Sequence, residues 1–169
     1  MEQLRGRLWY RACGLSNVWL ADLEYRTCPL CGCLDYTVPE VRSLFRKLVE
    51  AVIFKTTMLC GEEVCFLRYQ LALTVHDFAR LLCLSLDGVQ ALEDGTRRVT
   101  PLEDRVLRVV AAQQCLRWRF PLDRLNAVDL TRADAARVLL KLSGRKWRMV
   151  SMCGGLVLLG CVTRNAWTY

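Results

Sequence analysis

Three cysteines in the segment TCPLCGC, Cys28, Cys31 and Cys33, have the spacing in this chain that best suits metal chemistry. A Cys-x-x-Cys turn directs two thiolates toward one tetrahedral ion, and the proline and glycine within the segment favour that turn. A structural Zn²⁺ site takes four ligands, yet the sequence contains no second Cys-x-x-Cys. We therefore expect Cys13, Cys28, Cys31 and Cys33 to bind Zn²⁺, with Cys60 as another candidate ligand. The alternative is a degenerate turn whose thiols are free and reduced.

The chain has 10 cysteines among 169 residues, which raises the question of disulfides. The N-terminal segment lacks the apolar stretch of a secretory signal, and no apolar run approaches the roughly 20 residues of a membrane span. We therefore expect a cytoplasmic protein with reduced thiols and no membrane partner, because disulfide frameworks belong to exported proteins.

Residues 74–95 combine the signals of two short helices joined by a turn. Thr74 and Ser85 can each cap a first helical turn, and Gly95 can end the second helix. The apolar residues between them recur at helical spacing. This pattern predicts a helix-turn-helix, a unit whose second helix commonly lies in the major groove of DNA.

The candidate DNA-binding residues fall on and around this second helix. Bases would be contacted by Ser85, Asp87 and Gln90, and the phosphate backbone by residues on either side. The full candidate set is Thr74, Ser85, Leu86, Asp87, Gln90, Arg97 and Arg98. Gln90 alone is a good base-reading side chain, while Asp87 would repel phosphate but could accept from a cytosine amine. This weak outward chemistry keeps open a repressor-like domain that binds protein.

Charge is unevenly distributed along the chain. The formal net charge is +7 overall, with −2 in residues 58–112 and +7 in residues 113–169. Basic residues of the last third flank Trp118 and Trp147, an interleaving that suits nucleic-acid backbones and also protein interfaces. Binding of DNA would need help from this third, and binding of RNA also stays open.

The coarse pattern predicts an α+β protein with three regions: a β-rich CxxCG module with its following helix (1–57), a helical domain (58–114) and a basic segment with a β-hairpin (115–169). Extended pieces are expected within 18–26 and 34–38, helices over 39–54, 61–71 and 101–114, and a short helix at 122–125. Residues 55–59 are expected to form a linker. Strands are expected at 138–142, 146–150 and 156–162. In the helix from Pro101, we expect Leu102 to face the core and Asp104 to be solvated.

The ordered segments resemble one bacterial family, the MqsA-type antitoxins and related regulators, in which a CxxCG zinc-ribbon-like module precedes a Cro/repressor-type helix-turn-helix. The matching segments are CGLSNVWL (13–20), YRTCPLCG (25–32), VPEVRSLFRKLV (38–49), GEEVCFLRYQLALTVHDFARLL (61–82), PLEDRVLRVV (101–110), FPLDRLNAVDL (120–130) and KLSGRKWRMV (141–150). The chain departs from the family pattern at Val75, Gly88, Ala91 and Leu92.

The resemblance implies a homodimeric, autorepressing DNA-binding regulator that can neutralise a partner toxin. The alternative is a repressor-like interaction module, either toxin-neutralising or a subunit of a larger protein or ribonucleoprotein complex. No Ser/His/Asp set, phosphate-binding glycine loop or close carboxylate pair is evident in the sequence. We therefore do not expect an enzyme.

Overall fold

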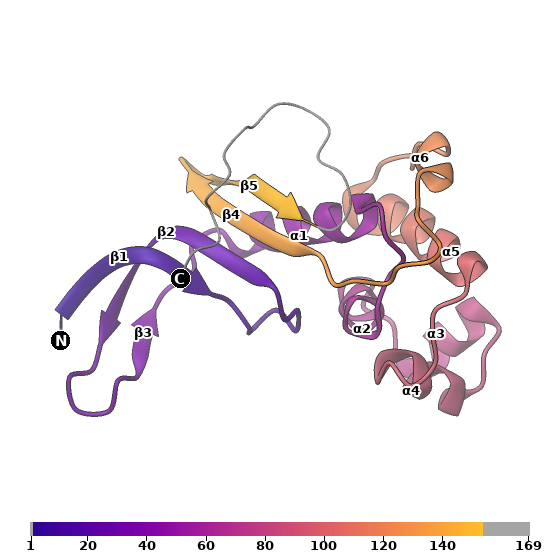
Figure 1. The fold of residues 1–169 in the computed structure, drawn as a ribbon, viewed down its shortest axis with the longest axis horizontal. Coiled ribbons are helices and arrows are strands. Elements are labelled where there is room, and N and C mark those ends of the chain that lie inside the picture. Colours follow the sequence, from indigo (N-terminus) through magenta and orange to yellow (C-terminus); the bar gives the residue numbers. More distant parts are fainter. Residues whose placement is uncertain (1, 154–169) are drawn as a thin grey trace.

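The structure is a computed structural model that describes residues 2–153. It is a mixed α+β fold, with strands at both ends of the described chain and the helices between them (Figure 1). The strands are β1 (Glu2–Trp9), β2 (Val18–Thr27), β3 (Leu34–Tyr36), β4 (Arg137–Ser143) and β5 (Lys146–Cys153). The helices are α1 (Val41–Phe54), α2 (Gly61–Gln70), α3 (Val75–Leu82), α4 (Leu86–Glu93), α5 (Pro101–Ala111) and α6 (Asp123–Asn126), with a π-helical turn η1 (Ala112–Leu116) after α5.

All five described strands belong to one sheet, in the order β1-β2-β4-β5, with β3 also pairing with β2. Strands β2 and β4 are parallel, with Val18 opposite Val138 and Leu20 opposite Leu140. The predicted N-terminal module and C-terminal hairpin are thus parts of the same sheet. Parallel strands need a long crossover connection, and here every helix of the described chain lies within it. Local sequence patterns do not reveal such a pairing, so the sequence did not predict it.

Strand β1 was not predicted, although Leu4, Gly6 and Leu8 alternate with two arginines in EQLRGRLW. It pairs antiparallel with β2 along its length, with Leu8 opposite Leu20 and Trp9 opposite Trp19. Leu8 and Leu20 are both buried, so this alternation is that of a strand with one face in the core.

Helix α1 occupies the centre of the fold, between the sheet and the other helices (Figure 1). The side chains that it buries are Leu44, Leu48, Val49, Ala51, Val52 and Ile53. Strand β5 packs against it through Trp147, which is fully buried. The backbone N–H of Trp147 donates to Ser43 Oγ at 3.2 Å, and its indole N–H donates to the carbonyl of Pro39 at 2.9 Å. These contacts fix the β4–β5 hairpin at the start of α1.

Residues 55–59 form a buried connection rather than a solvated linker. Lys55 forms a buried ion pair with Glu63 and donates to the carbonyl of Asp134 at 2.8 Å. Glu63 also accepts from the backbone N–H of Ala136 at 2.9 Å. The segment before β4 is therefore held to the start of α2 by buried polar contacts. The strand expected at 156–162 lies outside the described residues.

Helix α5 corrects two expectations at once. Asp104 is only 1% exposed, whereas Leu102 is 72% exposed. Arg108 lies one helical turn after Asp104 and pairs with it, and its guanidinium is also buried. This pair sets how the helix is rotated about its own axis. The face that carries it can be turned inward because Arg108 and Asp104 bond to each other and backbone groups of residues 53–59 satisfy their remaining polar atoms. Leu102, in the first turn of α5, is directed to solvent.

Candidate nucleic-acid interface

The two helices predicted for residues 74–95 are present as α3 and α4. Thr74 Oγ1 accepts from the backbone N–H of Asp77, and Ser85 Oγ accepts from the backbone N–H of Gly88, each at 3.1 Å. These are the N-terminal caps that the sequence predicted. Between the helices Cys83 adopts a left-handed conformation with φ 54°, and the backbone N–H of Leu84 donates to the carbonyl of Ala79 at 2.9 Å.

One side of α4 is fixed in the core by Val89 and Leu92, both fully buried. Its C-terminal end lies directly against the first residue of α2. A Cβ on Gly61 would stand 2.6 Å from the carbonyl oxygen of Leu92, closer than Cβ atoms in real proteins approach a neighbour. Arg68 of α2 also donates to both carboxylate oxygens of Glu93, at 2.5 and 2.9 Å. These contacts hold α4 rigidly on α2. A helix that presents its other side to a ligand needs such support.

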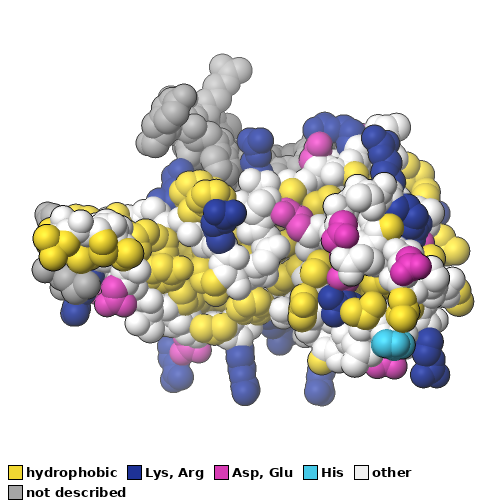
Figure 2. Space-filling model, turned by 90° about the horizontal axis from the view of Figure 1, so that it is seen from below, with side chains coloured by type: hydrophobic (Ala, Val, Ile, Leu, Met, Phe, Trp, Pro, Cys, Tyr) yellow, Lys and Arg dark blue, Asp and Glu magenta, His cyan; other side chains and the backbone are white. Residues whose placement is uncertain are grey.

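The predicted groove-facing side chains do lie on the outer side of α4. Leu86 is 43% exposed, and Asp87 and Gln90 are exposed as well. The Gln90 amide donates to Asp94 Oδ1 at 2.9 Å, so the single good base-reading group is engaged by an acid one turn further on. Figure 2 shows the molecule from below, on the side that carries α3 and α4. On this surface hydrophobic and acidic side chains lie among the basic ones.

The two arginines after α4 differ in their surroundings. Arg97 donates to both carboxylate oxygens of Glu103, at 2.8 and 3.3 Å, while Arg98 is exposed. Glu103 also forms a capping box with Thr100 at the start of α5. Burial opposes the ionisation of Glu103, but the hydrogen bonds from Arg97 and Thr100 outweigh it and lower the pKa of this carboxyl. Arg97 therefore secures the loop between α4 and α5, and Arg98 is the more accessible of the two for phosphate.

The cysteine turn lies between β2 and β3, at the end of the sheet away from the helices (Figure 1). The backbone N–H of Gly32 donates to the carbonyl of Cys28 at 2.9 Å, and that of Cys28 donates to the carbonyl of Cys33 at 3.0 Å. Cys31 and Cys33 are exposed. Hydrogen bonds lower the pKa of Cys31. The largest effect comes from the backbone N–H of Cys33, and smaller ones come from the thiols of Cys33 and Cys28. Cys28, Cys31 and Cys33 therefore belong to one hydrogen-bonded turn.

Cys13 is not gathered with them, which corrects the predicted ligand set. It precedes β2, whereas Cys28 follows it, and the ten residues of this strand span about 30 Å. The Cys13 thiol is buried and donates to the carbonyl of Tyr10 at 3.3 Å. Cys60, the other candidate ligand, is the N-cap residue of α2. Within residues 2–153, no group of three or more His, Cys, Asp or Glu side chains is arranged to hold a metal ion. The structure thus separates Cys13 from Cys28, Cys31 and Cys33, and the binding of Zn²⁺ stays a prediction.

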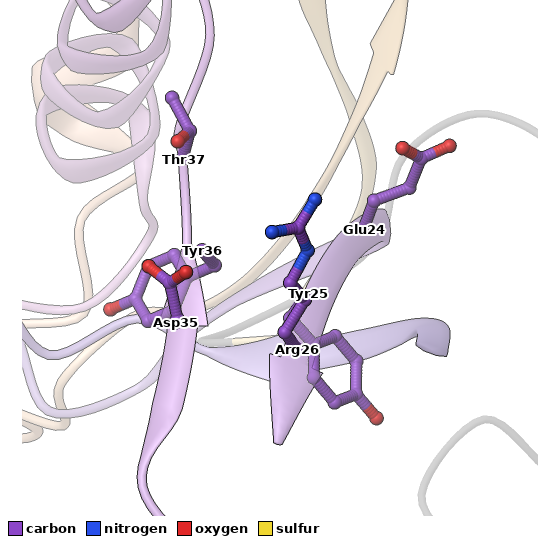
Figure 3. A pocket seen from close by; sticks show the side chains of 6 residues that line it. All are labelled: Glu24, Tyr25, Arg26, Asp35, Tyr36 and Thr37. Carbon is purple, nitrogen blue, oxygen red and sulfur yellow. The ribbon is translucent and has the colours of Figure 1, made fainter. Parts of the chain in front are cut away.

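A polar hollow of about 330 Å³ lies on the β2–β3 hairpin next to this turn (Figure 3). Its lining residues are Glu24, Tyr25, Arg26, Asp35, Tyr36 and Thr37. Arg26 is directly opposite Asp35, and Tyr25 is opposite Tyr36, so these are cross-strand neighbours of one hairpin. In Figure 3 the Tyr25 ring points to the opposite side of the hairpin from the Arg26 guanidinium. Such pairs stabilise a short hairpin, which explains this side-chain composition.

The two tryptophans flanked by basic residues have different environments. Trp147 is buried against α1, as described above, and so is not available to a ligand. Trp118 follows η1 and is 42% exposed. Sequence spacing could not separate them, because both are preceded and followed by basic residues.

Comparisons with known proteins found no matching family model, no matching curated protein and no matching solved structure. No helix in the described part of the chain is long and apolar enough to cross a membrane.

Proposed function

We propose that this protein is a DNA-binding transcription regulator of the antitoxin type, which acts as a homodimer and represses its own operator. Helix α4 enters the major groove, and α3 lies across the phosphate backbone. Two copies would contact half-sites about 34 Å apart, one helical turn of the duplex.

The observation that supports this proposal most directly is the α3–α4 pair. Both helices are capped, the turn between them is short, and α4 is held on its inner side by Val89 and Leu92. Its outer side, with Asp87 and Gln90, is exposed. This is the geometry by which a helix-turn-helix presents its second helix to DNA.

The charge on this surface predicts modest affinity. Gln90 is accompanied by Asp87 in the first turn of α4 and by Asp94 at its C-cap, and Arg97 is paired with Glu103. Phosphate contacts dominate the affinity of most DNA-binding proteins, so few available cations mean weak binding with a shallow dependence on salt. Sequence preference would then come from Gln90, which suits adenine, and from Asp87, which suits cytosine.

The test is an electrophoretic mobility experiment with the DNA upstream of the protein's own gene and a scrambled duplex of equal length, each at two salt concentrations. We expect a discrete shifted band with the upstream DNA only. Gln90→Ala should weaken binding roughly 5- to 150-fold, because a bidentate base contact contributes about 1–3 kcal/mol. Gln113→Ala, an exposed glutamine after α5, is the matched control and should leave binding unchanged. Equal behaviour of the two variants would argue against recognition through α4.

A second candidate function is protein binding by the same helices, with a toxin or a subunit of a larger complex as partner. The exposed Leu86 beside Asp87 favours it, as does an open hollow of about 480 Å³ beside α3. This hollow is lined by Leu73, Asp77, Arg80, Leu81 and Gln114. Under this function, Leu86→Asp and Leu81→Asp would abolish capture of the product of the neighbouring gene, while the mobility of DNA would not change in any variant.

A further inference from the structure

A basic surface lies along α1, at a distance from α4 in the fold. It is formed by three segments: the outer side of α1, the chain after η1 and the β4–β5 turn. We call it the α1 basic face, and it consists of Arg42, Arg46, Arg117, Trp118, Arg119, Arg145 and Lys146, all exposed. Figure 1 shows α4 at the lower right, whereas the β4–β5 turn lies at the upper left.

Specific contacts bring the three segments together. The β4–β5 turn is held at the start of α1 by the hydrogen bonds of Trp147 to Ser43 and Pro39. At the other end of the face, Arg46 donates to the carbonyl of Leu116 at 3.2 Å. Its guanidinium lies over the Trp118 ring, 5.8 Å from the centroid. Arg42 is one helical turn before Arg46 and so lies between the two ends.

The carboxylates at the start of α1 and within it neutralise one cation of this face, Arg145, and leave the others. Glu40, the N-cap residue of α1, is paired with Arg145 at 3.1 Å, and Glu50 is paired with Lys47 at 2.5 Å. Each acid therefore has a basic partner, and the remaining cations form a positively charged strip. Such a strip attracts a polyanion and releases its counterions.

We propose that the α1 basic face binds single-stranded nucleic acid, with an unpaired base stacked on Trp118 and its phosphates along Arg42, Arg46 and Arg117. The indole is exposed, and Arg46 holds it in place. Aromatic rings between arginines are the usual platform for single strands, because every base has a face to stack. A duplex keeps its bases paired and stacked, so it could use the cations but not Trp118. This site is separate from α4 and does not rest on operator binding.

The test measures the fluorescence anisotropy of a labelled 15-nucleotide oligo(dT), and of a 15-base-pair duplex, titrated with the full-length protein at 50 and 200 mM salt. We expect the oligo(dT) to bind more tightly than the duplex at both salt concentrations. Trp118→Ala should weaken oligo(dT) binding roughly 5- to 150-fold, the usual effect of losing one base–aromatic stack. Trp118→Phe should restore most of the affinity.

The charge contribution is tested by Arg42→Gln and Arg117→Gln together. This double variant should lower the slope of log K against log[salt] by about 1.4, since each phosphate contact of a single strand contributes about 0.7. Arg105→Gln, an exposed arginine of α5, controls for net charge and should change the slope little.

Trp9 offers a matched aromatic control. It is 44% exposed and has Arg11 at 4.7 Å from its ring, but it lies at the β1–β2 connection, where Ser16 binds Glu62. Trp9→Ala should leave oligo(dT) binding unchanged. The proposal is overturned if oligo(dT) does not bind at 50 mM salt, if the duplex binds equally well, or if Trp118→Ala has no larger effect than Trp9→Ala. Urea unfolding of each variant verifies that it is folded.

Discussion

Arg108 and Asp104 form an ion pair inside the helical part of the fold, with Arg108 Nε 2.7 Å from Asp104 Oδ2. The same guanidinium donates to the carbonyls of Ile53, Lys55 and Thr57, each at 2.7 Å. The other oxygen of Asp104 accepts from the backbone N–H of Leu59 at 2.8 Å. One buried pair on α5 therefore satisfies the end of α1 and the connection to α2. Carbonyls at the end of a helix lack partners within it, so this role is structural.

We predict that Arg108→Leu destabilises the protein by about 3–5 kcal/mol, because it leaves the Asp104 carboxylate buried without its partner. The double variant Asp104→Leu/Arg108→Leu should recover only part of this loss, since the carbonyls of residues 53–57 remain unsatisfied. Urea unfolding followed by circular dichroism measures both. Arg105→Leu on the same helix is exposed and should change stability by about 0.5 kcal/mol or less. A small effect of Arg108→Leu would contradict the buried position of this pair.

The contact of Gly61 with α4 gives a second prediction. A methyl group on residue 61 would overlap the carbonyls of Leu92 and Glu93, at 2.6 and 2.7 Å, and backbone cannot move aside cheaply. Gly61→Ala should therefore cost about 1–3 kcal/mol of stability, as overpacking does, and should displace α4. Any binding that depends on α4 should weaken more than the loss of folded protein explains.

Gly6→Ala is the control for this substitution. Gly6 lies in β1, and a Cβ there would meet the Tyr25 side chain at 3.6 Å, an ordinary contact. We expect no loss of stability beyond about 0.5 kcal/mol. If Gly61→Ala cost as little stability as Gly6→Ala, α2 and α4 would not be in close contact.

The sequence predicted the features that depend on local chemistry. Thr74 and Ser85 cap their helices as expected, because a cap needs only a side-chain oxygen next to free backbone amides. It failed where partners are distant in the chain. Asp104 looked solvated because the carbonyls that complete its network belong to residues 53–57. The parallel pairing of β2 with β4 likewise joins residues about 120 positions apart.

The candidate site divides in the same way. The outward position of Gln90 follows from helical periodicity. Its hydrogen bond to Asp94 and the pairing of Arg97 with Glu103 could not be inferred from the sequence pattern and are known only from the structure. The expected proximity of Cys13 to the cysteine turn was wrong, because β2 is one long strand that separates them. Two short strands with a turn between them would have brought them together.

Glu103 should make stability depend on pH in the acid range. Its folded-state pKa lies below the ordinary value of 4.5, so its contribution is present above about pH 4.5 and is lost as the pH falls through the lower folded value. We predict that the urea midpoint of the native protein falls between pH 5 and pH 3 by more than that of Glu103→Gln. Arg97→Gln should reduce this pH dependence as well. Parallel profiles for the native protein and Glu103→Gln would disprove the assignment.

The thiols should differ widely in reactivity. Burial, and to a smaller extent the charge of Glu63, raises the pKa of Cys60 to about 12. Hydrogen bonds lower the pKa of the exposed Cys31. Because the thiolate is the nucleophile, iodoacetamide at pH 7.5 should label Cys31 early and Cys60 only after unfolding. Peptide mass spectrometry at increasing times measures this order. Early labelling of Cys60 would show that the start of α2 is open.

The same turn determines where Zn²⁺ would bind. We predict that Cys31→Ser lowers the zinc content of the purified protein, while Cys13→Ser leaves it unchanged, because Cys13 lies at the other end of β2. Elemental analysis per mole of chain is the measurement. Loss of zinc in Cys13→Ser would restore the four-cysteine site, and less than about half an equivalent in the native protein would favour free thiols.

The acidic groups on α4 predict a gain of function, which is the sharpest test of its orientation. Asp94 lies one turn after Gln90 and accepts from its amide, so both side chains face the same side. If this side meets DNA, the Asp94 carboxylate repels phosphate, and Asp94→Asn should tighten duplex binding roughly two- to tenfold at 50 mM salt, with less gain at 200 mM. Asp123→Asn, which removes an exposed acid from α6, should produce no such gain. Unchanged or weaker binding in Asp94→Asn would place the outer side of α4 away from the duplex, and the exposed Leu86 would then favour a protein partner.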